Sequence, residues 1–139
     1  MKTRRSRKET GREEFTLLEL MIALILVGMG LGGMLMANTY VQKTSEAAHE
    51  RMVATQDAHR VIELMRNTSA TGTFPNNVLV AYPAGGSVPG FTNLSGENVV
   101  VTYPAIGNDL LDILVTTNWL ELGRRNTSAQ LRTLMTKRN

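Results

Sequence analysis

The sequence predicts an α+β fold in which a long N-terminal α-helix packs on a small, mostly antiparallel β-sheet. Three observations lead to this prediction. An apolar run fills positions 15–37, and a polar stretch without Gly or Pro follows it as far as Arg66. The rest of the chain alternates short β-type segments with Gly- and Pro-containing turns. The first two segments are expected to form one helix, and the third is expected to form the sheet.

Residues 1–14 form a basic leader. They hold six of the fifteen basic residues and three of the twelve acidic residues, which leaves nine of each sign in the rest of the chain. The net charge of +3 therefore belongs to the leader, and the part after it is formally neutral. Nucleic acid is accordingly not an expected partner of the folded part.

Residues 15–37 are predicted to be a transmembrane helix. They read FTLLELMIALILVGMGLGGMLMA, with Glu19 as the single ionisable residue. A helix of this length rises about 34 Å, which is enough to cross a hydrocarbon core of about 30 Å. Because the run is longer than the apolar region of a secretory signal peptide, we expect it to be retained. The basic leader should stay on the cytoplasmic side, so that the chain after Ala37 is exported.

Residues 38–67 are expected to continue the same helix. One weakly apolar face is predicted from residues at helical spacing: Ala47, Ala54, Ala58, Val61 and Met65. A solvated face is expected from the charged residues Glu46, Glu50, Arg51 and Arg60. Small alanines at these positions favour close approach of the helix to the sheet or to a neighbouring molecule.

Residues 68–139 are predicted to form a small β-rich domain. Its expected strands are Val78–Tyr82, Asn98–Tyr103, Leu111–Trp119 and Ala129–Met135, with a turn at Gly123–Thr127 before the last one. The third strand is the best supported, because apolar residues alternate with polar ones along it, as in a strand with one buried face.

The sequence gives no sign of an enzyme. It contains no cysteine, which excludes thiol catalysis and thiolate metal sites. His49 and His59 are ten positions apart on one helix, about 15 Å in rise, and cannot share a metal. We find no catalytic carboxylate pair, nucleophile motif or phosphate loop. No metal or other cofactor is therefore expected, and Arg124 and Arg125 are expected to be solvated.

The segment Phe15–Ala23, FTLLELMIA, resembles the start of type IV prepilins and of type II secretion pseudopilins. The resemblance implies that a prepilin peptidase removes the leader between Glu14 and Phe15 and that Phe15 is then methylated. It also implies that Glu19, at the fifth mature position, pairs with the N-terminal amine of a neighbouring subunit. One residue departs from the family pattern, because Glu14 stands where the family has Gly before the cut.

Four glycines lie in the middle of the apolar run: Gly28, Gly30, Gly32 and Gly33. Each costs about 0.5–1 kcal/mol relative to Ala inside a helix. Gly28 and Gly32 are spaced as in close-packing faces of membrane helices. The resemblance adds that this part of the helix unwinds locally in assembled filaments. The run around these glycines is most similar to minor pilins of the pilus-modification type.

The expected function is that of a structural subunit, a minor pilin with a pilin-like fold. The resemblance implies a single-pass inner-membrane protein that an assembly platform extracts into a pilus beside other pilin subunits, with membrane lipids as its earlier surroundings. Two alternatives stay open. One is a pseudopilin of a type II secretion system, and the other is a single-span membrane protein with a periplasmic binding domain that never assembles.

Overall fold

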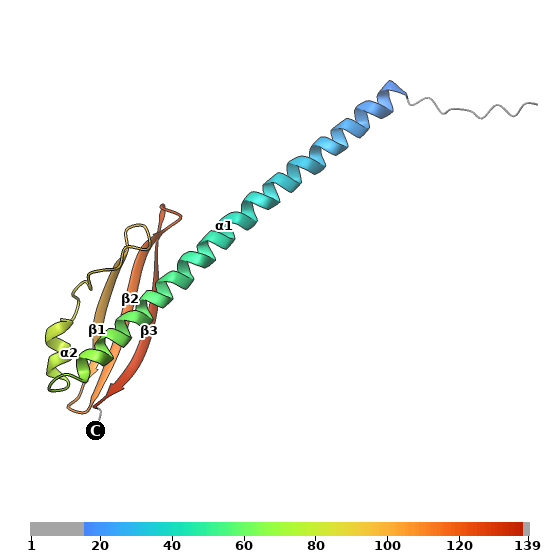
Figure 1. The fold of residues 1–139 in the computed structure, drawn as a ribbon. Helices are drawn as coiled ribbons and strands as arrows, with labels where there is room; N and C mark the ends of the chain where they lie inside the picture. The colour runs from blue at the N-terminus through green and yellow to red at the C-terminus, as the bar shows by residue number, and fades with distance from the viewer. Residues whose placement is uncertain (1–15, 138–139) are drawn as a thin grey trace, which may run out of the picture. The chain divides into compact units, whose positions relative to one another are not determined.

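A computed structural model describes residues 16–137 of the chain. It contains two helices and three strands, in the order α1 (Leu17–Ser69), α2 (Asn76–Ala81), β1 (Asn98–Ile106), β2 (Leu110–Glu121) and β3 (Arg125–Thr136) (Figure 1). The fold is α+β, as the sequence predicts.

The chain divides into two compact units, Met1–Tyr40 and Val41–Asn139, and helix α1 contributes residues to both. In the first unit the described residues are helical from Leu17 onward, and all of them are exposed. The predicted membrane helix therefore forms as a helix from Leu17 to its expected end at residue 37. The leader, Glu14 and Phe15 lie outside the described residues.

In the second unit, the C-terminal part of α1 covers one face of the sheet (Figure 1). The helix residues that are buried here are Ala54, Asp57, Ala58, Val61, Ile62 and Met65. Four of them belong to the predicted apolar face, which is therefore confirmed, and Ala47 at its start is half-buried. Helix α1 ends at Ser69, two residues beyond its expected end.

The three strands form one antiparallel sheet in the order β1-β2-β3. The central strand β2 buries every second side chain against α1: Leu111, Ile113, Val115, Thr117 and Trp119. This is the alternation that the sequence predicts. In β1 the register shifts between Thr102 and Ala105, where Pro104 lies and has no N–H to donate to the ladder.

The prediction of a strand at Val78–Tyr82 is wrong, because these residues belong mainly to helix α2. The segment is rich in β-type residues, but only Val78 is buried, and Val80 is 82% exposed. The preceding Asn77 donates a side-chain hydrogen bond of 2.6 Å to the Thr68 carbonyl at the end of α1. Packing and this link to α1 therefore override the local preference for a strand.

The turn between β2 and β3 is tighter than the predicted turn at 123–127. It consists of residues 122–124, and β3 already begins at Arg125. Leu122 and Gly123 both adopt left-handed backbone conformations, with φ of 52° and 67°. Glycine adopts this conformation readily, whereas a leucine does so at a cost of about 1–2 kcal/mol. The turn therefore needs support from outside the hairpin.

Candidate functional site

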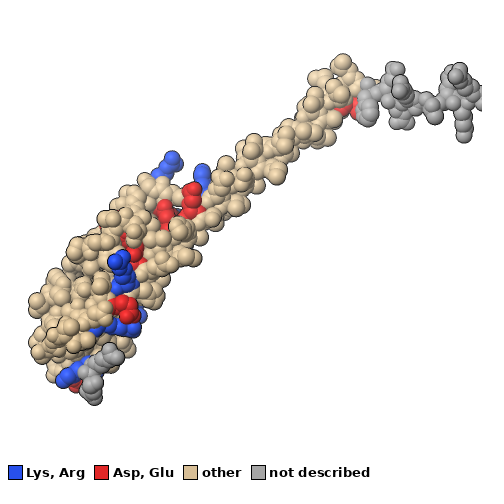
Figure 2. Space-filling view, in the orientation of Figure 1, with Lys and Arg blue, Asp and Glu red and all other residues tan. Residues whose placement is uncertain are grey.

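The N-terminal part of α1 exposes a continuous apolar surface. Its exposed large side chains include Leu17, Leu24, Ile25, Met29 and Met34, each at least half exposed. Figure 2 shows a long stretch of the helix without basic or acidic side chains, which by sequence runs from Leu20 to Gln42. By length and composition, α1 is able to cross a membrane. A surface of this kind in water would be costly, so the segment requires an apolar environment.

Glu19 lies in the first turn of α1, beside a helix cap that the sequence analysis missed. Its backbone N–H donates to the Thr16 hydroxyl oxygen at 3.2 Å, and the Leu20 N–H donates to the Thr16 carbonyl at 3.1 Å. Thr16 therefore caps the helix. The spacing Thr-x-x-Glu is that of a capping box, and this signal is present in the sequence. Within residues 16–137 the Glu19 carboxylate forms no ion pair.

The four glycines of the apolar segment lie on an unbroken stretch of α1. A Cβ atom added at Gly28, Gly30, Gly32 or Gly33 would meet nothing within 4 Å. No contact within the described chain therefore requires glycine at these positions.

The expectation of a solvated face is confirmed for Glu46, Arg51 and Arg60, which are exposed, whereas Glu50 is half-buried. Glu50 accepts hydrogen bonds from the Trp119 indole N–H at 3.3 Å and from the Leu122 N–H at 3.1 Å. Arg60 lies over the Phe91 ring, 5.8 Å from its centre. Of these four residues, Glu46 is the one that forms no ion pair, hydrogen bond or ring contact with another side chain within residues 16–137.

Arg51 takes part in a second contact between α1 and the sheet. Its guanidinium donates to one oxygen of the buried Glu121 carboxylate at 3.1 and 3.2 Å. Arg125, at the start of β3, pairs with the other oxygen at 2.7 Å. Two cations thus neutralise one buried acid, which would be costly to bury alone. Arg124 and Arg125 are both exposed, as predicted, and Arg125 in addition forms this ion pair.

These contacts depend on residues about 70 positions apart. The sequence contains the charges, but nothing in the local spacing shows which acid faces which base. The Glu50 and Arg51 side chains find their partners only because α1 crosses the sheet beside the β2–β3 turn.

An acidic pair, the buried Asp57 and the half-buried Glu97, links α1 to the loop that precedes β1. Asp57 is 5% exposed and accepts hydrogen bonds from the Asn93 side-chain amide at 3.0 and 3.2 Å. One Glu97 oxygen accepts from the backbone N–H groups of Asn93 and Leu94. Its other oxygen is buried and has no hydrogen-bond partner. Burial, and next the negative charge of Asp57, raise the pKa of the Glu97 carboxyl above 4.5.

The described residues contain no cluster of three His, Cys, Asp or Glu side chains that could hold a metal ion. His49 and His59 are both exposed on α1. Neither histidine has a hydrogen-bonded carboxylate or hydroxyl partner within residues 16–137, of the kind that orients a catalytic base.

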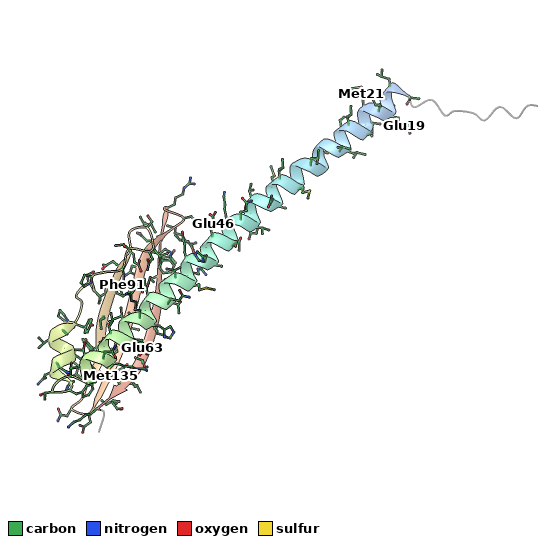
Figure 3. All side chains as sticks on the ribbon, in the orientation of Figure 1. Glu19, Met21, Glu46, Glu63, Phe91 and Met135 are labelled. Atoms are coloured by element: carbon green, nitrogen blue, oxygen red, sulfur yellow. The ribbon has the colours of Figure 1, made fainter. Side chains whose placement is uncertain are left out.

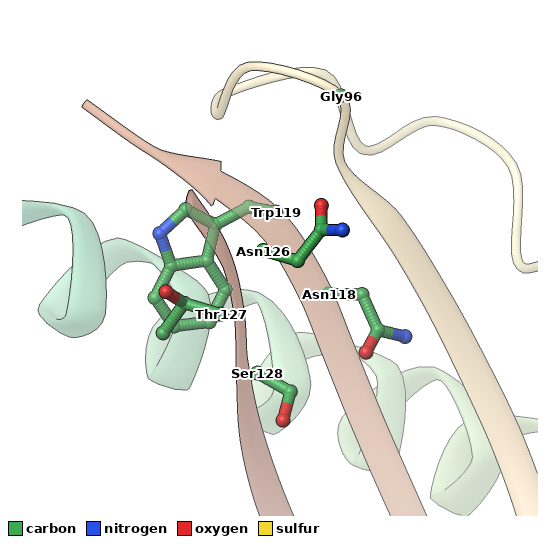
Figure 4. Close-up of a pocket in the computed structure, with 6 residues that line it drawn as sticks. All are labelled: Gly96, Asn118, Trp119, Asn126, Thr127 and Ser128. Atoms are coloured by element: carbon green, nitrogen blue, oxygen red, sulfur yellow. The ribbon is translucent and has the colours of Figure 1, made fainter. Parts of the chain in front are cut away.

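A shallow cavity of about 330 Å³ lies at the hairpin end of the sheet (Figure 4). It is lined by Gly96, Asn118, Trp119, Asn126, Thr127 and Ser128. Its lining offers amides and hydroxyls but no ionisable side chain. The indole N–H of Trp119 is already bonded to Glu50. This cavity therefore lacks the groups needed for acid–base or nucleophilic chemistry.

No protein-family model matches this chain, and no match was found among curated proteins or solved structures. The resemblance of Phe15–Ala23 to prepilins therefore stays a prediction from that segment.

Proposed function

We propose that this protein is a structural subunit of a type IV pilus, of the minor pilin kind, that assembles through its N-terminal helix. One combination of features carries the proposal. The segment Phe15–Ala23 resembles the prepilin start and leads into a single helix, α1, whose N-terminal part is apolar and exposed. The C-terminal part of that helix packs on an antiparallel sheet.

An exposed apolar helix suits both states that the proposal requires. Before assembly, lipid surrounds the helix, and after assembly the same helices of neighbouring subunits surround it. In either case the apolar side chains leave water, at about 25 cal/mol for each Å² that is buried. A soluble binding protein would have no use for such a surface.

Glu19 is the residue on which assembly should depend most. A carboxylate in apolar surroundings costs about 2–3 kcal/mol by the milder scales, and a cation beside it offsets that cost. The N-terminal amine of a neighbouring subunit would be such a cation, provided that the leader has been removed before Phe15. The pair would also fix how far one subunit is displaced along its neighbour.

The first experiment is mass spectrometry of N-terminal peptides from membrane fractions and from sheared filaments. The proposal predicts N-methylated Phe15 in the filament fraction. An intact leader in the membrane, with none of the chain in the sheared fraction, would refute the assembly role. The chain would then be a single-span membrane protein with an exported domain.

The second experiment separates the charge of Glu19 from its place three residues after the capping Thr16. Glu19→Gln keeps a capping-box side chain but removes the charge, and Glu19→Val removes both. Both variants should be lost from filaments if the charge is needed. Glu63→Gln is the matched control, because Glu63 lies farther along the same helix and is paired only with Arg66 (Figure 3). If Glu19→Gln assembles as well as this control, charge pairing is not the basis of assembly.

The same experiments apply to a type II secretion pseudopilin, which would use the same helix in the same way. The two systems are separated by asking which one loses activity when this chain is deleted. Loss of pilus assembly favours the minor pilin, and loss of protein secretion favours the pseudopilin.

A further inference from the structure

A second cavity lies where α1 passes the β2–β3 turn, within the unit Val41–Asn139. It has a volume of about 480 Å³ and is lined by Lys43, Glu46, Glu50, Leu122 and Arg124. The three residues from α1 are spaced by three and four positions, so they lie on one face of the helix. Leu122 and Arg124 belong to the turn.

The charged side chains around this cavity form no ion pair with one another. Glu50 is bonded to Trp119 and Leu122. Lys43, Glu46 and Arg124 form no ion pair with any residue between 16 and 137. The cavity thus presents two cations and the Glu46 carboxylate without ion-pair partners among residues 16–137, beside the partly exposed Leu122. The Glu50 carboxylate also lines it and keeps its negative charge, because its hydrogen-bond donors are uncharged. This arrangement complements a ligand that carries both a negative and a positive group.

The turn that carries Arg124 is held in place before any ligand arrives. The Leu122 N–H is bonded to Glu50 on α1, and the Arg124 N–H donates to the Glu121 carbonyl at 3.1 Å. The backbone of Arg124 is therefore fixed relative to Lys43. Such preorganisation reduces the entropy that binding would cost.

The position of the cavity along the chain indicates where the ligand would come from. Lys43 follows Ala37, the expected end of the membrane span, by six residues of α1. Six helical residues rise about 9 Å. The headgroup region beyond the hydrocarbon core is about 5–8 Å thick on each side of a bilayer. Along the chain, Lys43 therefore follows the expected end of the span by a distance close to the thickness of the headgroup region.

We propose that this cavity binds the phosphoethanolamine headgroup of a membrane lipid while the chain waits in the bilayer. The phosphate lies between Lys43 and Arg124, and the ammonium group lies against Glu46. A choline headgroup has the same charges but no N–H donor for Glu46, and a phosphoglycerol headgroup has no cation. The proposal rests on the membrane-stored state of the proposed function and not on assembly itself.

The test uses the full chain reconstituted in vesicles that contain equal amounts of phosphatidylethanolamine, phosphatidylcholine and phosphatidylglycerol. Native mass spectrometry then identifies the lipids that stay bound when the protein is released. Because exposed ion pairs contribute little each, we expect retained phosphatidylethanolamine to exceed each of the other lipids by about fivefold. Equal retention of all three lipids would overturn the proposal.

Three variants assign the preference to the cavity. Glu46→Gln should abolish the preference for ethanolamine over choline, and the double variant Lys43→Ala/Arg124→Ala should reduce retention of all three lipids. Lys137→Ala is the matched control, because Lys137 follows β3 at the other end of the sheet and forms no ion pair among the described residues. If Glu46→Gln keeps the preference, or if Lys137→Ala loses it equally, the cavity is not the lipid site.

Trp119 fluorescence checks that each variant is folded, since this single tryptophan is buried next to the cavity. Soluble phosphoethanolamine is then added to the full chain in detergent. If soluble phosphoethanolamine displaces the retained lipid at concentrations similar to those at which the lipid itself binds, the site takes a soluble ligand, and the membrane assignment is overturned. A chain that retains the lipid but is absent from sheared filaments would refute the pilin function and leave this site standing.

Discussion

Glu50 should be the residue that holds the β2–β3 turn on α1. Its carboxylate accepts the Trp119 indole N–H and the Leu122 backbone N–H. Leu122 has a left-handed backbone conformation, which a leucine adopts only under constraint. We therefore expect Glu50→Ala to destabilise the protein, because two donors lose their acceptor and the constraint on Leu122 is removed.

The size of the effect follows from the contacts. A hydrogen bond to a charged group contributes about 1.5–3 kcal/mol, and the partial exposure of this site reduces that to about 1 kcal/mol for each donor. Glu50→Ala should therefore lower the free energy of unfolding by about 2 kcal/mol. Glu50→Gln keeps one acceptor oxygen and should lower it by about 1 kcal/mol. With a urea dependence of about 1 kcal/mol per M for a domain of this size, the midpoints should fall by about 2 M and 1 M.

The assay is urea unfolding of the full chain in detergent, followed by Trp119 fluorescence. Glu46→Ala is the control, since Glu46 is an unpaired carboxylate about one turn earlier on the same helix, and it should change stability by less than about 0.5 kcal/mol. Adding Leu122→Gly to Glu50→Ala should restore about 1 kcal/mol, because glycine adopts this backbone conformation readily. If Glu50→Ala costs no more than Glu46→Ala, the turn does not depend on Glu50.

Two further predictions concern the interior of the second unit. The pKa of the Glu97 carboxyl is raised, mainly by burial and also by the charge of Asp57. The folded state therefore binds the carboxyl proton more tightly than the unfolded state does. The resulting stability is present below pH 4.5 and is lost as the pH rises through the raised pKa. We expect Glu97→Gln, whose amide can donate to Asp57, to be more stable than the wild type at pH 7 and to lose this advantage near pH 4, as measured by urea midpoints. A difference in midpoint between variant and wild type that is the same at both pH values would contradict the prediction. Ile113→Ala should lower the free energy of unfolding by about 2–5 kcal/mol, because Ile113 is fully buried between the sheet and α1. Leu134→Ala should lower it by less than about 1 kcal/mol, because Leu134 is 61% exposed. Similar losses for both variants would show that the core does not lie on this face of β2.

Much of the fold could be predicted from periodicity. The long helix follows from an apolar run and the polar stretch without Gly or Pro that continues it, and strand β2 follows from the alternation between Leu111 and Trp119. The apolar face of α1 was predicted for the same reason. These elements have patterns long enough to distinguish a period of 3.6 from a period of 2. Helix α2 has only six residues, too few for either period, and its β-type composition led to the wrong prediction.

The candidate assembly residues follow from the order of residues alone. Glu19, its position at the start of an apolar helix and the glycines at 28–33 are readable from the sequence, because a membrane helix is defined by its own composition. The contacts of Glu50, Arg51 and Glu97 are not readable in this way. Each of these side chains meets a partner from a distant segment, and its burial and charge balance exist only after α1 has packed on the sheet. The sequence by itself therefore determined the helix and its apolar surface. The tertiary structure decided which charged groups of the second unit are paired, which carboxylate oxygen is buried without a hydrogen-bond partner, and which charged groups have no ion-pair partner, because these contacts join segments that are distant in the chain.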